Sequence, residues 1–173
     1  MPAKSSKFRH QLPWRPDIQA VAGGKSAEDQ TEVVRRAFAA FTLRDVDSLL
    51  ELMDGDVEFL PVGTTSLTGQ TGPYRGHEGI RTYFEDIGRV WQELRVIPAR
   101  YRTAGPYVLV LGSVYARDAE GNLTDVPTGW IWKLRGGKLI WGRAYASRKE
   151  ALLAMSDGEP EKTPKPNESD FSQ

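Results

Sequence analysis

Glu58, Tyr74 and His77 are the residues of this chain whose side chains could transfer protons near a pocket. A carboxylate buried among apolar neighbours has a raised pKa and can act as a base, and histidine titrates close to neutral pH. We therefore predict these three as the candidate catalytic residues. Two of them also have a structural interpretation, with Glu58 as a solvated strand residue and His77 as a polar residue at a helix start.

A second group of residues could contact a hydrophobic ligand, because its members are aromatic, small or cationic and fall in predicted strands or at a helix end. The predicted ligand-binding residues are Phe59, Trp91, Gly129, Trp130, Ile131, Arg143, Ala144 and Tyr145.

Composition argues against several other kinds of site. The chain of 173 residues has no cysteine and only two histidines, so we predict no metal and no cofactor. The glycine-rich stretch 63–73 has no lysine in phosphate-loop order, so a nucleotide is not indicated. Positive and negative side chains balance at 23 each, so we expect no binding to nucleic acid or to an anionic membrane. No apolar run reaches signal-peptide or membrane-spanning length, and we expect a cytoplasmic protein.

The elements that must position these residues centre on a hairpin. Gly136 and Gly137 separate two runs rich in aromatic and β-branched residues, which is the strongest hairpin signal in the chain. Apolar spacing and turn residues predict helices over 27–43, 45–53 and 74–91, strands over 57–60, 94–102, 107–117, 126–135 and 138–147, a loop over 63–73, and a short helix after Ser147. The expected fold class is α+β, with three N-terminal helices packed on a strongly curved, mostly antiparallel sheet and a short C-terminal helix.

One domain is expected over 26–155, because a chain of this length can bury one sizeable core. Residues 1–25 are predicted to form a flexible N-terminal arm, and 156–173 a disordered C-terminal tail, since both are poor in apolar residues and rich in polar ones. The few large apolar residues of the arm would dock on the domain itself or on a partner subunit.

Several motifs in this order resemble the nuclear transport factor 2-like superfamily and, within it, the SnoaL-like branch. The matching segments are Arg44-Asp45-Val46-Asp47 between the first two helices, the strand from Asp56 to Pro61, the helix start from Tyr74 to Ile80, and the ending from Gly137 to Tyr145. The resemblance implies a cone-shaped α+β barrel that encloses a cavity. It leaves the activity open, because this scaffold hosts isomerases, cyclases, hydrolases and proteins without catalysis.

The resemblance also allows the family's catalytic positions to be compared with this chain. Where steroid isomerase relatives carry a proton-shuttling Asp, an oxyanion-binding Tyr and a protonated Asp, this chain has Leu60, Ala37 and Gly129. Where epoxide hydrolases and SnoaL-type cyclases need an Asp on the last strand, it has Ala144. The usual catalytic carboxylates are therefore missing, and ketosteroid isomerase chemistry is not expected.

The two faces of the central hairpin can be assigned in two ways. In the favoured assignment the helices cover a face of small and aliphatic residues, and the aromatic residues form an outer face that mediates a homodimer. The inward set is then Val110, Gly112, Val114, Gly129, Ile131, Gly142 and Ala144, and the outward set is Tyr107, Tyr115, Trp130, Trp132, Trp141, Arg143 and Tyr145. The opposite assignment places the aromatic residues and Arg143 in the cavity.

Two functions follow from these observations. The first is a SnoaL-like protein that binds a hydrophobic small molecule, such as a polyketide, terpenoid or steroid-like compound, with or without isomerase, cyclase or hydrolase activity. The second is a homodimeric accessory protein that uses the aromatic sheet face for its contacts.

Overall fold

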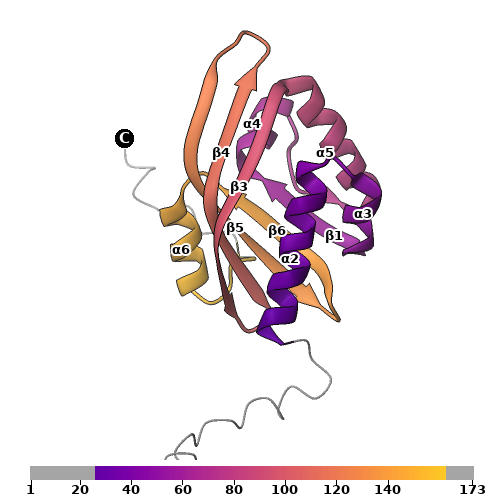
Figure 1. The fold of residues 1–173 in the computed structure, drawn as a ribbon, viewed down its shortest axis with the longest axis vertical. Helices are drawn as coiled ribbons and strands as arrows, with labels where there is room; N and C mark the ends of the chain where they lie inside the picture. The colour runs from indigo at the N-terminus through magenta and orange to yellow at the C-terminus, as the bar shows by residue number, and fades with distance from the viewer. Residues whose placement is uncertain (1–25, 163–173) are drawn as a thin grey trace, which may run out of the picture.

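Six strands form one curved sheet in the order β2-β1-β6-β5-β4-β3, as described for residues 26–162 by a computed structural model (Figure 1). The elements in chain order are α2 (Ala27–Thr42), α3 (Val46–Glu51), β1 (Met53–Pro61), α4 (Val62–Thr68), β2 (Tyr74–Arg75), α5 (Gly76–Val90), β3 (Trp91–Ala104), β4 (Tyr107–Asp118), β5 (Leu123–Arg135), β6 (Lys138–Tyr145) and α6 (Arg148–Ser156). The predicted α+β fold class is confirmed. The predicted N-terminal arm lies outside the described residues.

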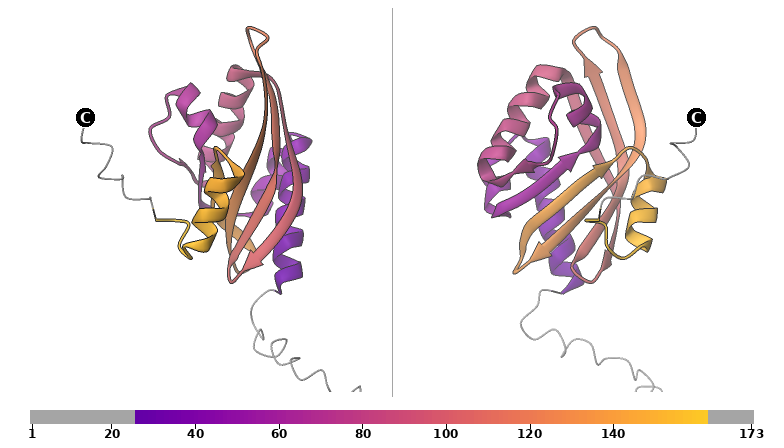
Figure 2. Two further views of the ribbon diagram at one scale, coloured as in Figure 1. Left: turned by 90° about the vertical axis from the view of Figure 1, so that its left-hand side faces the viewer. Right: turned by 180° about the vertical axis from the view of Figure 1, so that it is seen from behind.

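Strands β3 to β6 follow one another as antiparallel neighbours, as the sequence predicts. β1 pairs parallel to β6, and the two residues of β2 pair antiparallel to β1. Helices α2 and α6 lie on opposite faces of this sheet (Figure 2). The larger core joins α2, α3 and α5 to one face, and the second core joins α6 to the other.

Helix α2 begins where the sequence places a cap. The Ser26 side chain accepts a hydrogen bond from the Asp29 N–H, and the Asp29 carboxylate accepts one from the Ser26 N–H, which completes a capping box. Its buried residues recur at helical spacing and join those of α3 and α5 in the larger of two hydrophobic cores.

The region after β1 differs from the prediction. Residues 63–73 were expected to be a loop, but the structure has helix α4 there, which ends at Gly69 in the left-handed conformation (φ 76°). The third predicted helix begins at Gly76 instead of residue 74, because Tyr74 and Arg75 pair with β1 as a short edge strand.

The central hairpin carries one residue more on β6 than on β5. Gly136 and Gly137 both have positive φ, as a two-residue turn of this kind requires. Counting away from the turn, Leu134 of β5 pairs with Leu139 of β6, but the adjacent β5 residue, Lys133, pairs with Trp141. Ile140 is therefore the extra residue of a β-bulge.

This bulge decides which residues of β5 face the helices. An uninterrupted two-residue hairpin would pair Gly129 with Ala144, whereas the structure pairs Trp130 with Ala144 and Trp132 with Gly142. Because paired residues share a face, both tryptophans join Ala144 and Gly142 on the helix side. The outward assignment of Trp130 and Trp132 is wrong, since one extra residue reverses the face of every residue beyond it.

The inward assignment of Gly129 and Ile131 is wrong for the same reason. Both lie on the face that α6 covers: Ile131 is buried in the second core, and a Cβ placed on Gly129 would come within 2.6 Å of the Ala151 Cβ. The favoured face assignment is right for the other residues. Val110 and Val114 face the helices as predicted, and Trp141 lies on the outer face, where it packs in the second core.

Helix α6 is attached to the sheet at several points. The Ser147 hydroxyl caps its N-terminus, and the Arg148 guanidinium donates two hydrogen bonds to the Gly112 carbonyl at 3.0 and 2.9 Å. The segment after it also contacts the sheet, because Glu161 accepts hydrogen bonds from the Tyr107 hydroxyl at 2.5 Å and from Lys133 Nζ at 2.7 Å.

Candidate ligand-binding site

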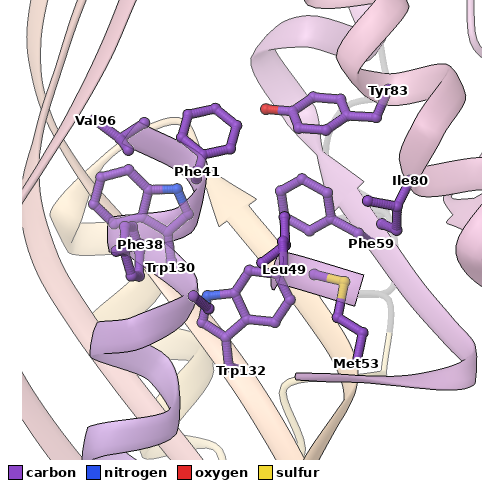
Figure 3. A pocket seen from close by; sticks show the side chains of 11 residues that line it. Phe38, Phe41, Leu49, Met53, Phe59, Ile80, Tyr83, Val96, Trp130 and Trp132 are labelled. Atoms are coloured by element: carbon purple, nitrogen blue, oxygen red, sulfur yellow. The ribbon is translucent and has the colours of Figure 1, made fainter. Parts of the chain in front are cut away.

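A small apolar chamber lies between the sheet and the helices. Its volume is about 50 Å³, and Figure 3 shows the aromatic side chains that point into it from β5, β1, α2 and α5. The lining residues are Ala37, Phe38, Phe41, Leu49, Met53, Phe59, Ile80, Tyr83, Val96, Trp130 and Trp132.

A larger cleft adjoins this chamber. The cleft has a volume of about 330 Å³ and shares Phe59, Tyr83, Val96 and Trp130 with the chamber. Residues found only in the cleft come from α4, β3, β4, β5 and β6 and the ends of neighbouring elements: Pro61, Gly63, Thr64, Leu67, Trp91, Leu94, Val114, Ala116, Thr124, Val126, Thr128, Ala144, Tyr145 and Ala146. The two spaces are therefore neighbours, and the cleft is the larger of them.

The chamber is smaller than the roomy hollow that small residues would leave. Phe59 stacks on Trp132 with ring centroids 5.1 Å apart and an interplanar angle of 13°, and Phe38 meets Trp130 edge-on at 5.1 Å. These rings fill the deep end of the cone because the bulge in β6 turns both tryptophans inward. The site is therefore aromatic, and its open volume lies mainly in the cleft.

No aspartate, glutamate, lysine, arginine or histidine among residues 26–162 lines the chamber or the cleft. The lining residues with polar side-chain groups are Tyr83, three threonines and the tryptophans, and Tyr145, which also packs in the second core, borders the cleft. Burial raises the pKa of Tyr83, while the nearby Arg44 charge and the Thr64 hydroxyl act in the opposite direction. The Tyr83 hydroxyl therefore stays neutral at physiological pH.

All three of the predicted catalytic residues lie outside this site. Glu58 alternates with the inward Phe59 on β1 and forms an ion pair with Arg75 on the neighbouring edge strand. Nε2 of the His77 ring lies 3.1 Å from the Met53 carbonyl oxygen, near the first turn of α5. The structure thus gives both residues contacts with protein groups away from the cleft.

The third, Tyr74, belongs to a buried polar cluster with Asp86. The Tyr74 hydroxyl donates a hydrogen bond to Asp86 Oδ2 at 2.7 Å, and Arg89 forms an ion pair with Oδ1 of the same carboxylate. The hydrogen bond from Tyr74 and the charge of Arg89 hold the pKa of Asp86 below its usual value against the effect of burial. This arrangement satisfies Asp86 and fixes α5 against β2.

Sequence reasoning missed Asp86, which is only 5% exposed. A signal for it exists in the sequence, because Asp86 stands in the apolar stripe of α5, three residues after Tyr83 and next to Ile87. A carboxylate in such a stripe needs a partner when it is buried.

The predicted ligand-binding residues divide into two groups. Those that line the chamber or the cleft are Phe59, Trp91, Trp130, Ala144 and Tyr145. Gly129 and Ile131 lie on the face that α6 covers, and Arg143 lies beside α6 with its guanidinium 5.1 Å from the centre of the Tyr145 ring.

Within the described part of the chain, no group of three or more histidine, aspartate or glutamate residues is placed to hold a metal ion. None of the helices between residues 26 and 162 is both long and apolar enough to cross a membrane.

The curved sheet, the helices on its inner face and the cavity between them define the cone-shaped α+β class of nuclear transport factor 2-like proteins. The chain belongs to the SnoaL-like domain family, whose model matches residues 34–141. No curated protein sequence matches the chain.

Several solved structures share this fold. A nuclear transport factor 2-like protein of unknown function from Burkholderia pseudomallei has a TM-score of 0.64 and 20% identity, covering 72% of this chain and 95% of its own. TerC, co-crystallized with polyporic acid, has a TM-score of 0.64 and 22% identity, and the match covers 75% of this chain and 96% of TerC. A Mycobacterium tuberculosis protein in complex with estradiol-17β-hemisuccinate has a TM-score of 0.58 and 14% identity, and the match covers 70% of this chain and 95% of that protein.

Proposed function

We propose that this protein binds a neutral, hydrophobic small molecule in the cleft, with one end of the molecule reaching the chamber. The observation that carries the proposal is an apolar cleft that shares four lining residues with a neighbouring aromatic chamber. A cleft of about 330 Å³ is at the lower end of the range for small-molecule sites.

Binding is proposed ahead of catalysis because of the chemistry of the lining. Proton transfer needs a group in reach of the ligand that titrates near neutral pH, and the carboxylates and imidazole of residues 26–162 lie outside both spaces. The titratable residues in the lining are Tyr83 and Tyr145, and burial raises the pKa of both above the usual tyrosine value. The solved structures of TerC with polyporic acid and of the M. tuberculosis protein with an estradiol derivative indicate that the fold accepts ligands built from several rings. A polyketide, terpenoid or steroid-like ligand is therefore the class proposed here.

Ala144→Leu tests the proposal, because Ala144 lines the cleft beside Trp130. A panel of neutral aromatic, steroid and terpenoid compounds that includes fluorene is measured by tryptophan fluorescence and by ligand-dependent melting. We expect binding to wild type and at least about a tenfold loss of affinity in Ala144→Leu, since the added carbons occupy ligand space.

The matched control is Ala39→Leu, because Ala39 is exposed on α2. This control should bind as wild type does. Equal affinity of Ala144→Leu and wild type for every compound that binds would place the ligand elsewhere and contradict the proposal.

A second candidate function is a homodimer through the outer sheet face. Ile97 is 49% exposed on β3, and Arg95 lies over the Tyr115 ring at 4.9 Å on the same face, so part of the aromatic face is not covered by α6. Sedimentation of wild type and Ile97→Asp tests the homodimer. A wild-type dimer that dissociates in the variant supports the proposal, and an unaltered dimer, or a monomeric wild type, contradicts it.

A cytoplasmic location is a further proposal.

A further inference from the structure

We propose that the indole N–H of Trp132 binds an uncharged acceptor oxygen, a carbonyl or an ether, of the ligand. This inference rests on the proposed function and specifies the chemistry of the end of the ligand that enters the chamber.

Trp132 is a buried donor without a protein acceptor. Its side chain lines the chamber, the residue is only 6% exposed, and among residues 26–162 no group accepts a hydrogen bond from Nε1. Buried polar groups in folded proteins nearly always have a hydrogen-bond partner, so a buried donor left unpaired on a residue that lines a cavity indicates a missing acceptor.

The surroundings of Trp132 fix how its ring is turned. A Cβ placed on Gly142 would come within 2.3 Å of ring atoms Cε3 and Cζ3, so the edge opposite the nitrogen lies against β6. Phe59 stacks on one face of the ring. Figure 3 shows the indole nitrogen on the side of the ring turned away from Met53. These contacts hold the N–H in a fixed orientation, and a fixed donor costs little entropy when it binds an acceptor.

The acceptor must be uncharged. An indole N–H can only donate, and neither the chamber nor the cleft has a basic side chain from the described residues to neutralise an anion. Burying an unpaired carboxylate or phosphate in such an apolar space is strongly unfavourable. A carbonyl or ether oxygen on an otherwise hydrophobic ring system satisfies both conditions.

Size supports the same conclusion. A chamber of about 50 Å³ is too small for a ring system but has room for a small polar group at the end of one. The rings of the ligand would remain in the cleft, which has most of the open volume.

The test compares 9-fluorenone with fluorene, which have the same tricyclic shape and differ in a carbonyl against a methylene. We expect wild type to bind 9-fluorenone about tenfold more tightly, which corresponds to one hydrogen bond of about 1.4 kcal/mol. In Trp132→Phe the ratio of the affinities for 9-fluorenone and fluorene should fall to about one, while the affinity for fluorene stays within about threefold of wild type.

Trp141→Phe is the matched control, because Trp141 packs in the second core on the other side of the sheet. It should keep the tenfold preference. Trp91 has a second buried N–H without an acceptor in residues 26–162, and it lines the cleft instead of the chamber. Loss of the preference in Trp91→Phe, with Trp132→Phe unaffected, would overturn the assignment to Trp132.

The carbonyl stretching frequency of bound 9-fluorenone gives a readout that does not depend on any variant. We expect it below the frequency in a hydrocarbon solvent for wild type. An unshifted frequency, or equal affinity of wild type for the two compounds, overturns this inference, and a water molecule on Trp132 would then be the acceptor. In that case fluorene still binds and the proposed function stands. Failure of both compounds to bind also overturns this inference, whereas only failure of the whole panel to bind contradicts the proposed function.

Discussion

Asp86 shows how a single buried charge is stabilised in this fold. The hydrogen bond from Tyr74 and the ion pair with Arg89 favour the ionised carboxylate, so its pKa lies below the value of about 3.9 expected in the unfolded chain. A group with a depressed folded-state pKa stabilises the folded state above its unfolded pKa, and this contribution is lost as the pH falls through the folded pKa.

We therefore predict that Asp86→Asn is less stable than wild type at pH 7 and that this difference shrinks below about pH 4. The measurement is urea unfolding of both proteins at pH 7, 5 and 3. Asp125→Asn is the control, because Asp125 is exposed, and it should change stability little at any of these values. If the free energies of unfolding of wild type and Asp86→Asn differ by the same amount at all three pH values, the ionised Asp86 carboxylate does not stabilise the folded state and the prediction is contradicted.

At the scale of residues, the sequence predicted local features better than distant partners. The capping box of Ser26 and Asp29 depends on residues three apart, and it is present in the structure. The partners of Glu58 and Tyr74 lie 17 and 12 residues away in the chain, and nothing in the local sequence identified them. Residue type alone predicts the candidate catalytic residues, and it carries no information on the groups that they contact.

At the scale of elements, the packing of α6 on β5 depends on the absence of a side chain. Gly129 pairs with Tyr145, and the Ala151 Cβ occupies the space where a side chain at position 129 would begin. The need for this close approach explains a glycine in the middle of a strand that is otherwise rich in large residues.

Gly129→Val should accordingly reduce the free energy of unfolding by about 1–3 kcal/mol, because the new side chain would force α6 away from the sheet. Gly88→Ala provides the comparison: Gly88 lies in α5 with no atom within 4 Å of the place that an alanine methyl would occupy, and alanine there should raise stability by about 0.5–1 kcal/mol. Both are measured by urea unfolding. Equal stability of Gly129→Val and wild type would show that α6 can move without cost.

The hairpin illustrates what the sequence of an element can and cannot predict. Gly136 and Gly137 predict the turn correctly, because its positive φ angles depend on those two residues alone. The bulge at Ile140 has no comparable local signal, since it arises from how the twisted strands of the whole sheet pair. As a result the sequence predicts both strands of the hairpin correctly, but it places Trp130 and Trp132 on the outer face when they face inward.

At the scale of the whole molecule, the site lies in the apolar interior of the cone and the ionised side chains lie elsewhere. No charged residue between positions 26 and 162 lines the chamber or the cleft, and burial keeps the Tyr83 hydroxyl neutral well above physiological pH. Binding of a neutral ligand should therefore not be linked to proton uptake or release.

We predict that the affinity for fluorene changes by less than about twofold between pH 5.5 and 9, since no lining group titrates in that range. Fluorescence titration across this range, at constant ionic strength, is the measurement. A dependence that follows a single ionisation would indicate a titrating group in contact with the ligand and would favour catalysis over simple binding.

The extra residue in β6 has a further consequence for the history of such proteins. Gain or loss of one codon at position 140 would reverse which residues of β5 and β6 share a face in a single genetic event, without any substitution in β5. Relatives that differ by such an insertion would present different cavity walls from nearly the same local sequence, which offers a short evolutionary route between unrelated ligands.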